Sequence, residues 1–344
     1  MPAIITGKIL VTGANGFIAR WIIKDLLEHG FSVRATVRSL EKADALKPVL
    51  AATYGDHLDF VTIDDFTAKD AFDEALKGID GVVHTAHPVD ATTDDPEEFI
   101  GPAVQSVTGI LSAASAPGST IKRVVYVSSV SAVIDSQRIH GLPDVLTDKD
   151  WNETDVAAVK EKGTTSSGFE KYQASKTLAE RKAWEGYNEE KAKGTNGWDL
   201  VTLCPPWVFG PYLGEATPEA LNYSMGSWYR TVVQEALPLP APLNVNWIDV
   251  RDFAAASRLA LTKPEAGGER FLVAAGASVW GRWVNTARRA LGKAGEPRPE
   301  SPEDGQKLVG LDRQKSLDLL GLKYRTLEET IAFILDDFKK RGWA

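Results

Sequence analysis

Residues 11–19 read Val-Thr-Gly-Ala-Asn-Gly-Phe-Ile-Ala, and this stretch decides the fold. It follows an apolar run at 8–11 and places Gly13, Gly16 and Ala19 at three-residue intervals. Gly13 permits a tight turn, Gly16 lets the backbone approach a pyrophosphate, and the small Ala19 lets a helix pack closely on a sheet. The N-terminus of that helix attracts an anion. The stretch therefore predicts a strand, a phosphate-binding turn and a helix, which together begin a dinucleotide-binding domain.

The remainder of the chain repeats this alternation of strand and helix. Between the expected strands lie helical stretches, the first of which is "FIARWIIKDLLEHG" at 17–30, with apolar residues at helical spacing and Gly30 as its stop. Short β-branched or apolar runs predict strands at 8–11, 32–37, 58–63, 81–86, 123–129, 198–204 and 270–276. We therefore expect an α/β protein with a Rossmann-type, doubly wound parallel sheet.

The pattern becomes irregular after residue 209, where prolines break it into short pieces. We expect a dinucleotide-binding Rossmann domain and a smaller C-terminal substrate-binding lobe. The final stretch, "TLEETIAFILDDFKKRG", has its apolar residues on one stripe and predicts an amphipathic packing helix. The expected division assigns 1–209 to the Rossmann domain, with 243–262 and 270–276 returning to it, and 210–242 and 277–344 to the lobe.

Composition narrows the classes of function. The 344 residues, 43% of them hydrophobic, suffice for a large core. The net charge of -8, without a dense Lys/Arg cluster, argues against nucleic acid as a partner. Cys204 is the only cysteine, which excludes an internal disulfide and fits a reducing compartment. No apolar run is long enough to cross a bilayer and no leader is evident. We expect a cytoplasmic protein, a monomer or a homodimer, that does not act on membranes.

The end of the second expected strand bears on the choice of cofactor. There the chain reads Thr-Val-Arg-Ser, so Arg38 stands where NAD-binding proteins carry a carboxylate, and Lys42 follows a turn later. A guanidinium pairs bidentately with a phosphate, which favours NADP(H) over NAD(H). The alternative is a solvated surface arginine, since Glu41 is nearby.

Two Tyr/Lys pairs occur at helical spacing on one predicted helix. Tyr172 pairs with Lys176 and Tyr187 with Lys191, each pair on one helix face. The two phenols would lie roughly 22 Å apart on a continuous helix, so only one can serve a given site. A capping box that begins at Ser167 puts Tyr172 in the first turn, near the strand tips where such sheets bind ligands. Tyr187 lies among glutamates, which predicts a solvated helix face.

The phenol of Tyr172 would need help to ionise. A free tyrosine has a pKa near 10, and lowering it by about three units requires roughly 4 kcal/mol of preferential phenolate stabilisation. The cation of Lys176 and an oxidised nicotinamide are candidates to supply it. Ser128, Ser129 and Ser131 stand near the C-terminal end of another expected central strand. Serines there also end strands or cap helices, but the downstream Tyr/Lys pair favours a catalytic role.

The order of motifs carries a family resemblance over almost the whole chain. The segments "VTGANGFIA", "VVYVSS", "YQASKTLAE", "CPPWVFGP" and "WIDVRDFA" resemble those of the extended short-chain dehydrogenases/reductases. "HTAHPV", "DKDWNE" and "LLGLKYRTLEETI" are most similar to the branch of dihydroflavonol reductases, cinnamoyl-CoA reductases and fungal methylglyoxal and aldehyde reductases. The resemblance implies an NADPH-dependent carbonyl reductase that converts an aldehyde, ketone or dicarbonyl to an alcohol.

The resemblance also implies roles for single residues. Ser129 would hydrogen-bond the substrate carbonyl, Tyr172 would deliver the proton, and Lys176 would hold the nicotinamide ribose and tune Tyr172. Asp65 and Phe66 would flank the adenine. The full set of expected cofactor-binding residues is Gly13, Asn15, Gly16, Phe17, Ile18, Arg38, Lys42, Asp65, Phe66, Ala86, Ser128, Tyr172, Lys176, Pro205 and Val208, of which Ala86 would line the cofactor channel and Pro205 and Val208 would position the carboxamide.

The expected substrate pocket comprises His87, Val133 and Trp207. His87 departs from the branch, which usually has a small residue there, and it either donates to a substrate oxygen or packs at a strand end. Most of the tryptophans are expected in the core, with Trp207 as a pocket wall. Four further histidines lack ligand-like spacing and are expected to be structural or on the surface, so no metal is expected: His29, His57, His84 and His140.

Three alternatives to a general carbonyl reductase stay open at this point. The first is a dihydroflavonol or cinnamoyl-CoA type reductase. The second is a sugar-nucleotide epimerase or dehydratase, which uses the same fold and Ser/Tyr/Lys set but needs a basic cluster in the C-terminal lobe, where the arginines are scattered. The third is a non-catalytic NADP-binding sensor, against which the intact Ser/Tyr/Lys set argues.

Overall fold

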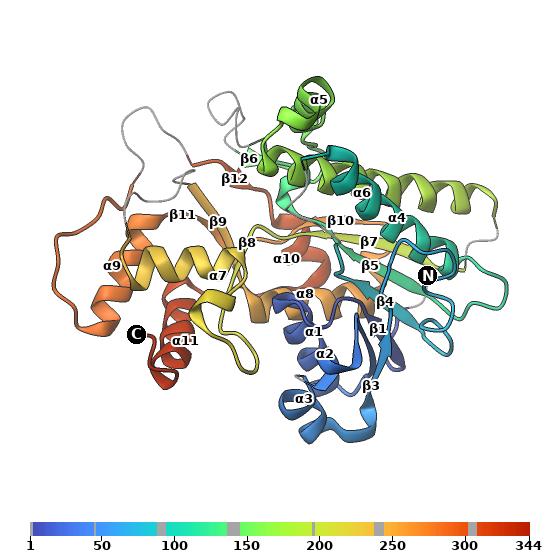
Figure 1. Cartoon of the computed structure of the whole chain (residues 1–344), viewed down its shortest axis with the longest axis horizontal. Coiled ribbons are helices and arrows are strands. Elements are labelled where there is room, and N and C mark those ends of the chain that lie inside the picture. The colour runs from blue at the N-terminus through green and yellow to red at the C-terminus, as the bar shows by residue number, and fades with distance from the viewer. Residues whose placement is uncertain are drawn as a thin grey trace.

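A computed structural model describes residues 3–44, 46–87, 94–135, 145–194, 197–236, 244–301 and 308–344. Its main sheet has seven parallel strands in the order β10-β7-β5-β4-β1-β2-β3. The predicted Rossmann-type doubly wound fold is thereby confirmed (Figure 1). The strands are β1 (Lys8–Val11), β2 (Ser32–Val37), β3 (Leu58–Thr62), β4 (Gly81–His84), β5 (Arg123–Val127), β7 (Asp199–Cys204) and β10 (Arg270–Leu272).

Helices cover both faces of this sheet. α4 (Pro96–Ala114) and α6 (Gly168–Ala192) pack together on one face, and α1 (Phe17–Glu28) and α8 (Val250–Thr262) pack together on the other (Figure 1). The strand order reverses direction at β1, which lies between β2 and β4. The crevice outside the carboxyl ends of β1 and β4 is therefore the place where such a sheet binds its ligand.

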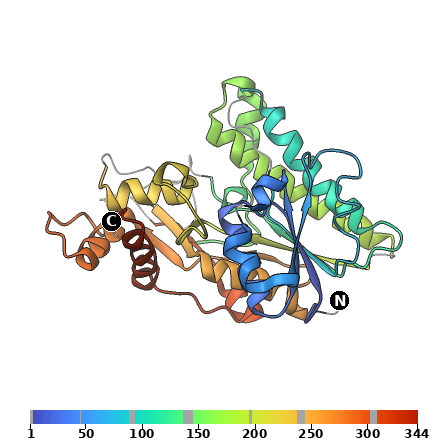
Figure 2. The same ribbon diagram turned by 60° about the horizontal axis from the view of Figure 1, so that its bottom comes forward.

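A second sheet and several helices lie beside the main sheet. β8 (Trp207–Phe209) pairs in parallel with β9 (Asn244–Asp249), and β9 pairs antiparallel with β11 (Gly276–Val279). Figures 1 and 2 show these strands beside the main sheet, with the C-terminus on their side of the molecule and the N-terminus far away. The helices of this region are α7 (Tyr223–Trp228), α9 (Trp280–Leu291) and α11 (Leu327–Lys340).

The remaining elements are short or peripheral. They are α2 (Leu40–Asp44), α3 (Lys47–Tyr54), α5 (Glu153–Lys162), α10 (Gln314–Leu320) and the strand pair of β6 (Val145–Leu146) with β12 (Gly310–Leu311). Within the segment expected to return to the Rossmann domain, β9 joins the smaller sheet, whereas α8 packs on α1. The division into two lobes stays a proposal.

The hydrophobic core consists of two main layers, one on each side of the main sheet. Alternation along β1 sends Ile9 and Val11 to the layer beneath α1 and α8, and Leu10 to the layer beneath α4 and α6. Because both faces are buried, the strands are apolar at nearly every position. This explains why the sequence shows them as continuous apolar runs.

One prediction about the core was wrong. Tyr187 was expected on a solvated helix face, but its side chain is 7% exposed and packs against the rings of Trp184 and Trp198. Burial, and then the charge of Asp199, raise the pKa of its phenol. Glu185 and Glu189 are exposed, because residues two positions apart on a helix do not share a face.

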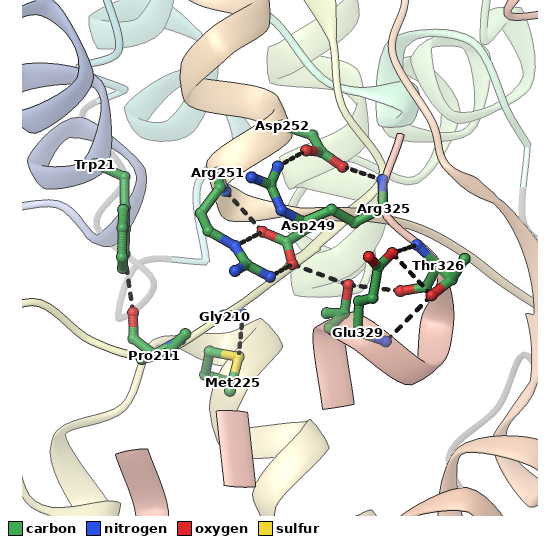
Figure 3. Close-up of polar contacts among 11 residues, drawn as sticks. Trp21, Gly210, Pro211, Met225, Asp249, Arg251, Asp252, Arg325, Thr326 and Glu329 are labelled. Atoms are coloured by element: carbon green, nitrogen blue, oxygen red, sulfur yellow. Dashed lines mark hydrogen bonds and ion pairs between the residues drawn. The ribbon is translucent and has the colours of Figure 1, made fainter. Parts of the chain in front are cut away.

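A hydrogen bond from Thr330 and an ion pair from Arg325, just before α11, connect the C-terminal helix to the start of α8 (Figure 3). Asp249 caps α8 by accepting from the Arg251 backbone N–H at 2.8 Å, and its carboxylate also binds the Arg251 guanidinium and the Thr330 hydroxyl. Asp252 binds the backbone N–H and the guanidinium of Arg325. The amphipathic stripe predicted for this helix is confirmed by the burial of Leu327, Ile331, Ile334, Leu335 and Phe338.

A search of the described residues finds no helix both long enough and apolar enough to cross a membrane.

Candidate active site

The glycine turn is tight and comes close to the backbone of Ala86. Gly13 has φ of 69°, a left-handed conformation that favours glycine, and a Cβ there would lie 3.3 Å from Ala86 Cα. Gly16 caps α1 without a side-chain hydrogen bond, and the first turn of α1 contains no acidic residue. The first amides of α1 therefore have no side-chain acceptor at the cap, which is compatible with the predicted anion site.

Two residues that the sequence did not single out hold this turn. The Arg20 side chain donates from Nε to the Asn15 carbonyl (3.2 Å) and from Nη1 to the Leu213 carbonyl (2.6 Å). The Tyr212 hydroxyl also donates to the Asn15 carbonyl, and its ring stacks on Phe17 at 6.2 Å. The loop after β8 thus braces the glycine turn, while Ile18 is partly buried beside it. Nothing in the local pattern signals this long-range contact.

Asn15 also leaves a polar atom without a partner. Its side-chain oxygen Oδ1 is buried and has no hydrogen-bond partner among the described residues. An unpaired buried acceptor is costly and calls for a donor from a bound molecule or water. Together with the uncapped amides, this atom fits a turn that is completed by a ligand.

Two cations stand free beyond β2. Arg38 directly follows the last residue of β2, and both Arg38 and Lys42 are exposed. Within the described part of the chain, neither side chain has a hydrogen bond or an ion pair; only the Lys42 backbone N–H is bonded, to Ser39. Exposed cations without partners at this strand end suit a ribose phosphate.

The residues expected around the adenine and the cofactor channel differ in how much of each side chain is exposed. Asp65 is exposed, and its Oδ1 accepts from the backbone N–H and the hydroxyl of Thr67. The ring of Phe66 is buried against Phe72, with ring centroids 5.7 Å apart. The backbone of Phe66 is therefore the part left to meet a nucleotide. Ala86 lies against Gly13, as described above.

The three expected catalytic residues come together at one edge of the main sheet. Ser129 caps the short turn at Val130–Ala132 that follows β5, and its side chain lies close enough to the Tyr172 phenol for its hydrogen bonding to lower the phenol's pKa. Tyr172 lies in the first turns of α6, which begins at Gly168 after the predicted capping box of Ser167 and Glu170. Residues from distant segments are thus brought together.

The pKa of the Tyr172 phenol is raised from its ordinary value. Burial is the larger cause, and the hydrogen bond with Ser129 acts in the opposite direction. Desolvation of phenolate therefore outweighs the stabilisation that the chain supplies without an oxidised nicotinamide. The phenol is therefore protonated at neutral pH, the form that donates a proton.

Lys176 follows one helical turn later. Its side chain is 5% exposed, and Nζ lies 3.5 Å from the Val127 carbonyl at the end of β5. Burial lowers the pKa of its ammonium to about 8, although the charge of Glu180 partly opposes this. The ammonium is thus placed beside the strand end with few ligands of its own.

His84 is a structural histidine, as expected. The Thr12 hydroxyl accepts from the backbone N–H groups of Thr85 and Ala86, so its own proton goes to His84 Nδ1 at 2.9 Å. Nε2 then donates to Ser106 at 3.2 Å. Burial, and then the charge of Lys176, lower the pKa of His84 to about 3, so the ring stays neutral. It ties β1, β4 and α4 together.

His87 contacts the catalytic helix directly. Its ring meets the Tyr172 ring edge to face at 5.9 Å and 88°. Its Nε2 lies 3.1 Å from the Ser175 hydroxyl, whose own proton is donated to the Tyr172 carbonyl at 2.7 Å. Nε2 must therefore carry the proton and donate. Burial, followed by the charges of Lys176 and His84, lowers the pKa of His87 well below its ordinary value.

We predict a moderate catalytic effect of His87. Replacing His87 with leucine removes its ring contact with Tyr172 and its hydrogen bond to Ser175, and should lower kcat about fivefold, as expected for a loss of about 1 kcal/mol. The kcat of the parent should show no inflection near pH 6.5, because the imidazole stays neutral. Steady-state kinetics between pH 5 and 8 check both statements. His29→Leu, at an exposed residue, is the control, and an equal loss in both variants would contradict the role.

The other expected site residues differ in their hydrogen bonds, strand pairing and burial. The Ser128 hydroxyl donates to Glu180 at 2.7 Å. The Pro205 carbonyl accepts from Val130 N–H at 3.0 Å. Val208 pairs with β9, and Val133 is buried beside Cys204. Trp207 is partly buried and stacks on exposed Tyr223 at 5.4 Å, whereas Trp228 and Trp283 lie in the core.

No group of three or more His, Cys, Asp or Glu in the described residues could hold a metal ion. His29 and His57 are exposed, and His140 lies outside the described residues.

Comparison with known proteins identifies the family. The protein-family model described as "NAD dependent epimerase/dehydratase family" matches residues 9–274 of the sequence. The chain belongs to this family. The match spans the whole main sheet from β1 to β10, so the epimerase/dehydratase assignment rests on the Rossmann fold together with the site.

Three similar proteins lie within the reductases of this family. The ketoreductase azaE of Aspergillus niger is 34% identical over 345 residues, covering 94% of this chain and 95% of that protein. Aldehyde reductase 2 of Sporidiobolus salmonicolor is 30% identical over 333 residues, covering 94% and 93%. The crystal structure of yeast methylglyoxal/isovaleraldehyde reductase Gre2 complexed with NADPH has a TM-score of 0.82 at 28% identity, covering 98% of this chain and 100% of that one. The predicted resemblance to extended short-chain reductases is confirmed.

Proposed function

We propose that the chain is an NADPH-dependent carbonyl reductase that converts an aldehyde, a ketone or a dicarbonyl to an alcohol. The observation that carries the proposal is the placement of the Ser129 side chain beside the Tyr172 phenol, with buried Lys176 one turn along the same helix. The similar proteins, named as a ketoreductase, an aldehyde reductase and an NADPH-complexed methylglyoxal/isovaleraldehyde reductase, support the same reaction type.

The residues of the chain divide the work at the substrate oxygen. Bound NADPH supplies the hydride that the carbonyl carbon accepts. The Ser129 hydroxyl hydrogen-bonds the carbonyl oxygen and stabilises the negative charge that develops on it. The Tyr172 phenol gives its proton to the same oxygen, so that the neutral alcohol is the product. The Lys176 cation holds the ribose and stabilises the phenolate that Tyr172 becomes.

The chain has residues suited to hold the cofactor. The turn of Gly13, Asn15 and Gly16 would take the pyrophosphate on the first amides of α1, and Arg38 with Lys42 would take the ribose phosphate. Asp65, the Phe66 backbone, Ala86, Pro205 and Val208 would line the rest of the channel. The other expected cofactor-binding residues, Phe17, Ile18 and Ser128, would lie next to these contacts.

The substrate pocket is proposed from the elements around the phenol. His87, Val133 and Trp207 would form its walls, with Tyr223 extending the aromatic surface of Trp207. Aromatic walls suit a hydrophobic or aryl carbonyl compound. Such a pocket does not by itself separate a general carbonyl reductase from the dihydroflavonol or cinnamoyl-CoA type, because the same chemistry serves all of them.

A substrate panel tests the proposal. Purified protein is mixed with NADPH and, in turn, with aldehydes, ketones, dicarbonyls, a dihydroflavonol and a cinnamoyl-CoA ester, and the loss of NADPH absorbance is followed. Sugar nucleotides with NAD are assayed in parallel. Consumption of NADPH with a carbonyl compound supports the proposal. Binding of NADPH without consumption would favour a sensor, and turnover of a sugar nucleotide would favour an epimerase or dehydratase.

Arg38 is predicted to set the cofactor preference. Replacing Arg38 with serine removes the guanidinium that pairs with the ribose phosphate, and should weaken NADPH binding about tenfold to hundredfold, as expected for a charge-assisted hydrogen-bond pair. NADH binding should change less than about twofold, because NADH lacks that phosphate. Fluorescence titration with both cofactors measures this. Arg282→Ser, at an exposed residue of the smaller lobe, is the control, and equal weakening for both cofactors would contradict the assignment.

A further inference from the structure

A fully buried carboxylate lies beneath the catalytic residues. Glu180 is on α6, one turn after Lys176 and two turns after Tyr172, and its side chain is 0% exposed. Its oxygens accept from the Arg270 guanidinium at 2.9 and 3.1 Å and from the Ser128 hydroxyl at 2.7 Å. The buried thiol of Cys204 makes a further contact at 3.6 Å. The mechanism above uses none of these contacts.

The partner arginine reaches three backbone carbonyls on two further segments. Arg270 Nη1 donates to the carbonyls of Asp148 (2.9 Å) and Asp150 (2.6 Å), and Nη2 lies 3.4 Å from the Ala132 carbonyl. The guanidinium lies over the ring of Trp151 at 3.8 Å. One buried cation therefore holds the turn after β5 and the segment after β6 against β10.

These contacts enclose the turn that carries Ser129. Ser128, just before Ser129, is bonded to Glu180, and Ala132, at the end of the same turn, lies within reach of Arg270. Both ends of the Ser129 turn are thus fixed by one ion pair. Because Glu180 belongs to the helix of Tyr172 and Lys176, the pair ties the serine turn to the helix of the phenol.

We propose that Glu180 and Arg270 are a positioning pair, which sets the Ser129 hydroxyl against the Tyr172 phenol and thereby governs the chemical step. This inference rests on the proposed function for its kinetic readout. A carboxylate and a guanidinium suit the task, because both are rigid and planar and bind through two hydrogen bonds.

The chain supplies a matched control for a purely structural ion pair. Arg123 and Asp199 form an equally buried guanidinium–carboxylate pair, with 0% and 4% side-chain exposure. They begin β5 and β7, whereas Ser128 and Cys204 lie at the opposite ends of the same two strands. Arg123 also donates to backbone carbonyls of neighbouring segments, those of Ala260 and Lys263. The two pairs thus differ mainly in their distance from the phenol.

The test compares Glu180→Gln with Asp199→Asn. Each replaces a buried carboxylate by an amide of similar size, so both variants should lose a similar amount of thermal stability. At a temperature where both are folded, kcat of Glu180→Gln should fall about tenfold to hundredfold, while kcat of Asp199→Asn stays within about twofold of the parent. The NADPH dissociation constant, from fluorescence titration, should change less than about threefold in either. Equal kcat in the two variants would show that the Glu180 pair is only structural.

A second readout does not depend on turnover. The ionisation of the tyrosines is followed by ultraviolet absorbance in Glu180→Gln and in the double variant Glu180→Gln with Tyr172→Phe. The difference between the two titration curves isolates the Tyr172 phenol. If the Ser129 hydrogen bond is lost, the phenol titrates at higher pH than in the parent, because that bond favours phenolate. The titratable groups around the phenol are Lys176, neutral His87 and Tyr126. An unchanged titration of the phenol would overturn the positioning role of the Glu180–Arg270 pair, whether or not the protein reduces a carbonyl compound. A protein that reduces no carbonyl compound would overturn the proposed function instead.

Conservative variants cover the case in which Glu180→Gln does not fold. Arg270→Lys keeps the charge but not the fork, and should keep the fold and lower kcat about tenfold. The double variant Glu180→Met with Arg270→Met removes both charges and leaves no unpaired ion, so it should fold and show the low kcat of the positioning loss. Parental kcat in both would refute the proposal.

Discussion

Replacing Tyr172 with phenylalanine should lower kcat about a thousandfold. The phenol is the group that donates to the substrate oxygen, and general acid catalysis by one side chain contributes about a hundredfold to ten-thousandfold. NADPH binding should be nearly unchanged, because the variant keeps the ring that packs on His87 and the helix that carries Lys176. Single-turnover and steady-state measurements of NADPH consumption, with fluorescence titration for binding, check this expectation.

Tyr187→Phe is the matched control. Tyr187 belongs to the second Tyr/Lys pair of the same helix but is buried between Trp184 and Trp198, where it meets the core and not the cofactor crevice. Its loss of one hydroxyl should leave kcat within about twofold of the parent. If Tyr187→Phe lost activity and Tyr172→Phe kept it, the assignment of the proton donor would be wrong.

Replacing Lys176 with methionine should lower activity and raise stability together. Without the ammonium, phenolate and ribose each lose a partner, and kcat/KM should fall about a hundredfold or more. Folding, in contrast, no longer has to bury a cation whose pKa is lowered from 10.5 to about 8. At neutral pH that shift corresponds to roughly 1 to 3 kcal/mol of stability, once the lost contact with the Val127 carbonyl is allowed for.

The pH dependence of this effect has a definite sign. In the unfolded chain Lys176 keeps its proton up to its ordinary value of 10.5, whereas in the folded protein it loses the proton near pH 8. Between these values the unfolded state binds more protons, so the stability of the parent rises with pH relative to the methionine variant. The stability advantage of the variant is therefore full below pH 8 and disappears toward pH 10.5. Activity of the parent should decline in the same range, as the ammonium is lost.

Chemical denaturation of the cofactor-free protein at several pH values measures this difference. Lys191→Met is the control. Lys191 is exposed, with its Nζ 5.7 Å from the centroid of the Tyr187 ring, so folding does not bury its ammonium. A Lys176→Met protein less stable than the parent at neutral pH, or equally active, would show that the buried ammonium has another role.

Much of the site could be predicted because its parts are local. The glycine turn depends on residues within one strand-turn-helix unit, and Gly13 has the left-handed φ that its position predicted. The capping box of Ser167 and Glu170 begins α6 as expected, since a cap involves residues three apart. The Tyr172–Lys176 spacing follows from helix geometry alone.

Other parts of the site were not predictable, because they depend on contacts between distant segments. Glu180 lies in the motif that carried the family resemblance, but its partner Arg270 is ninety positions away and looked like one of several scattered arginines. Tyr212 reaches the glycine turn from the loop after β8. Tyr187, read as solvated from its acidic neighbours, is buried because α6 turns that face toward Trp198.

The sequence by itself determined the order of strands and helices, the phosphate-binding turn and the residue types at the strand ends, since periodicity, glycine and caps act over a few residues. Only the tertiary structure decided which side chains are desolvated. Burial raises the pKa of Tyr172, lowers that of Lys176 and leaves His84 and His87 neutral. These shifts arise from the packing of segments far apart in the chain, because the cost of removing a charge from water depends on everything that surrounds it.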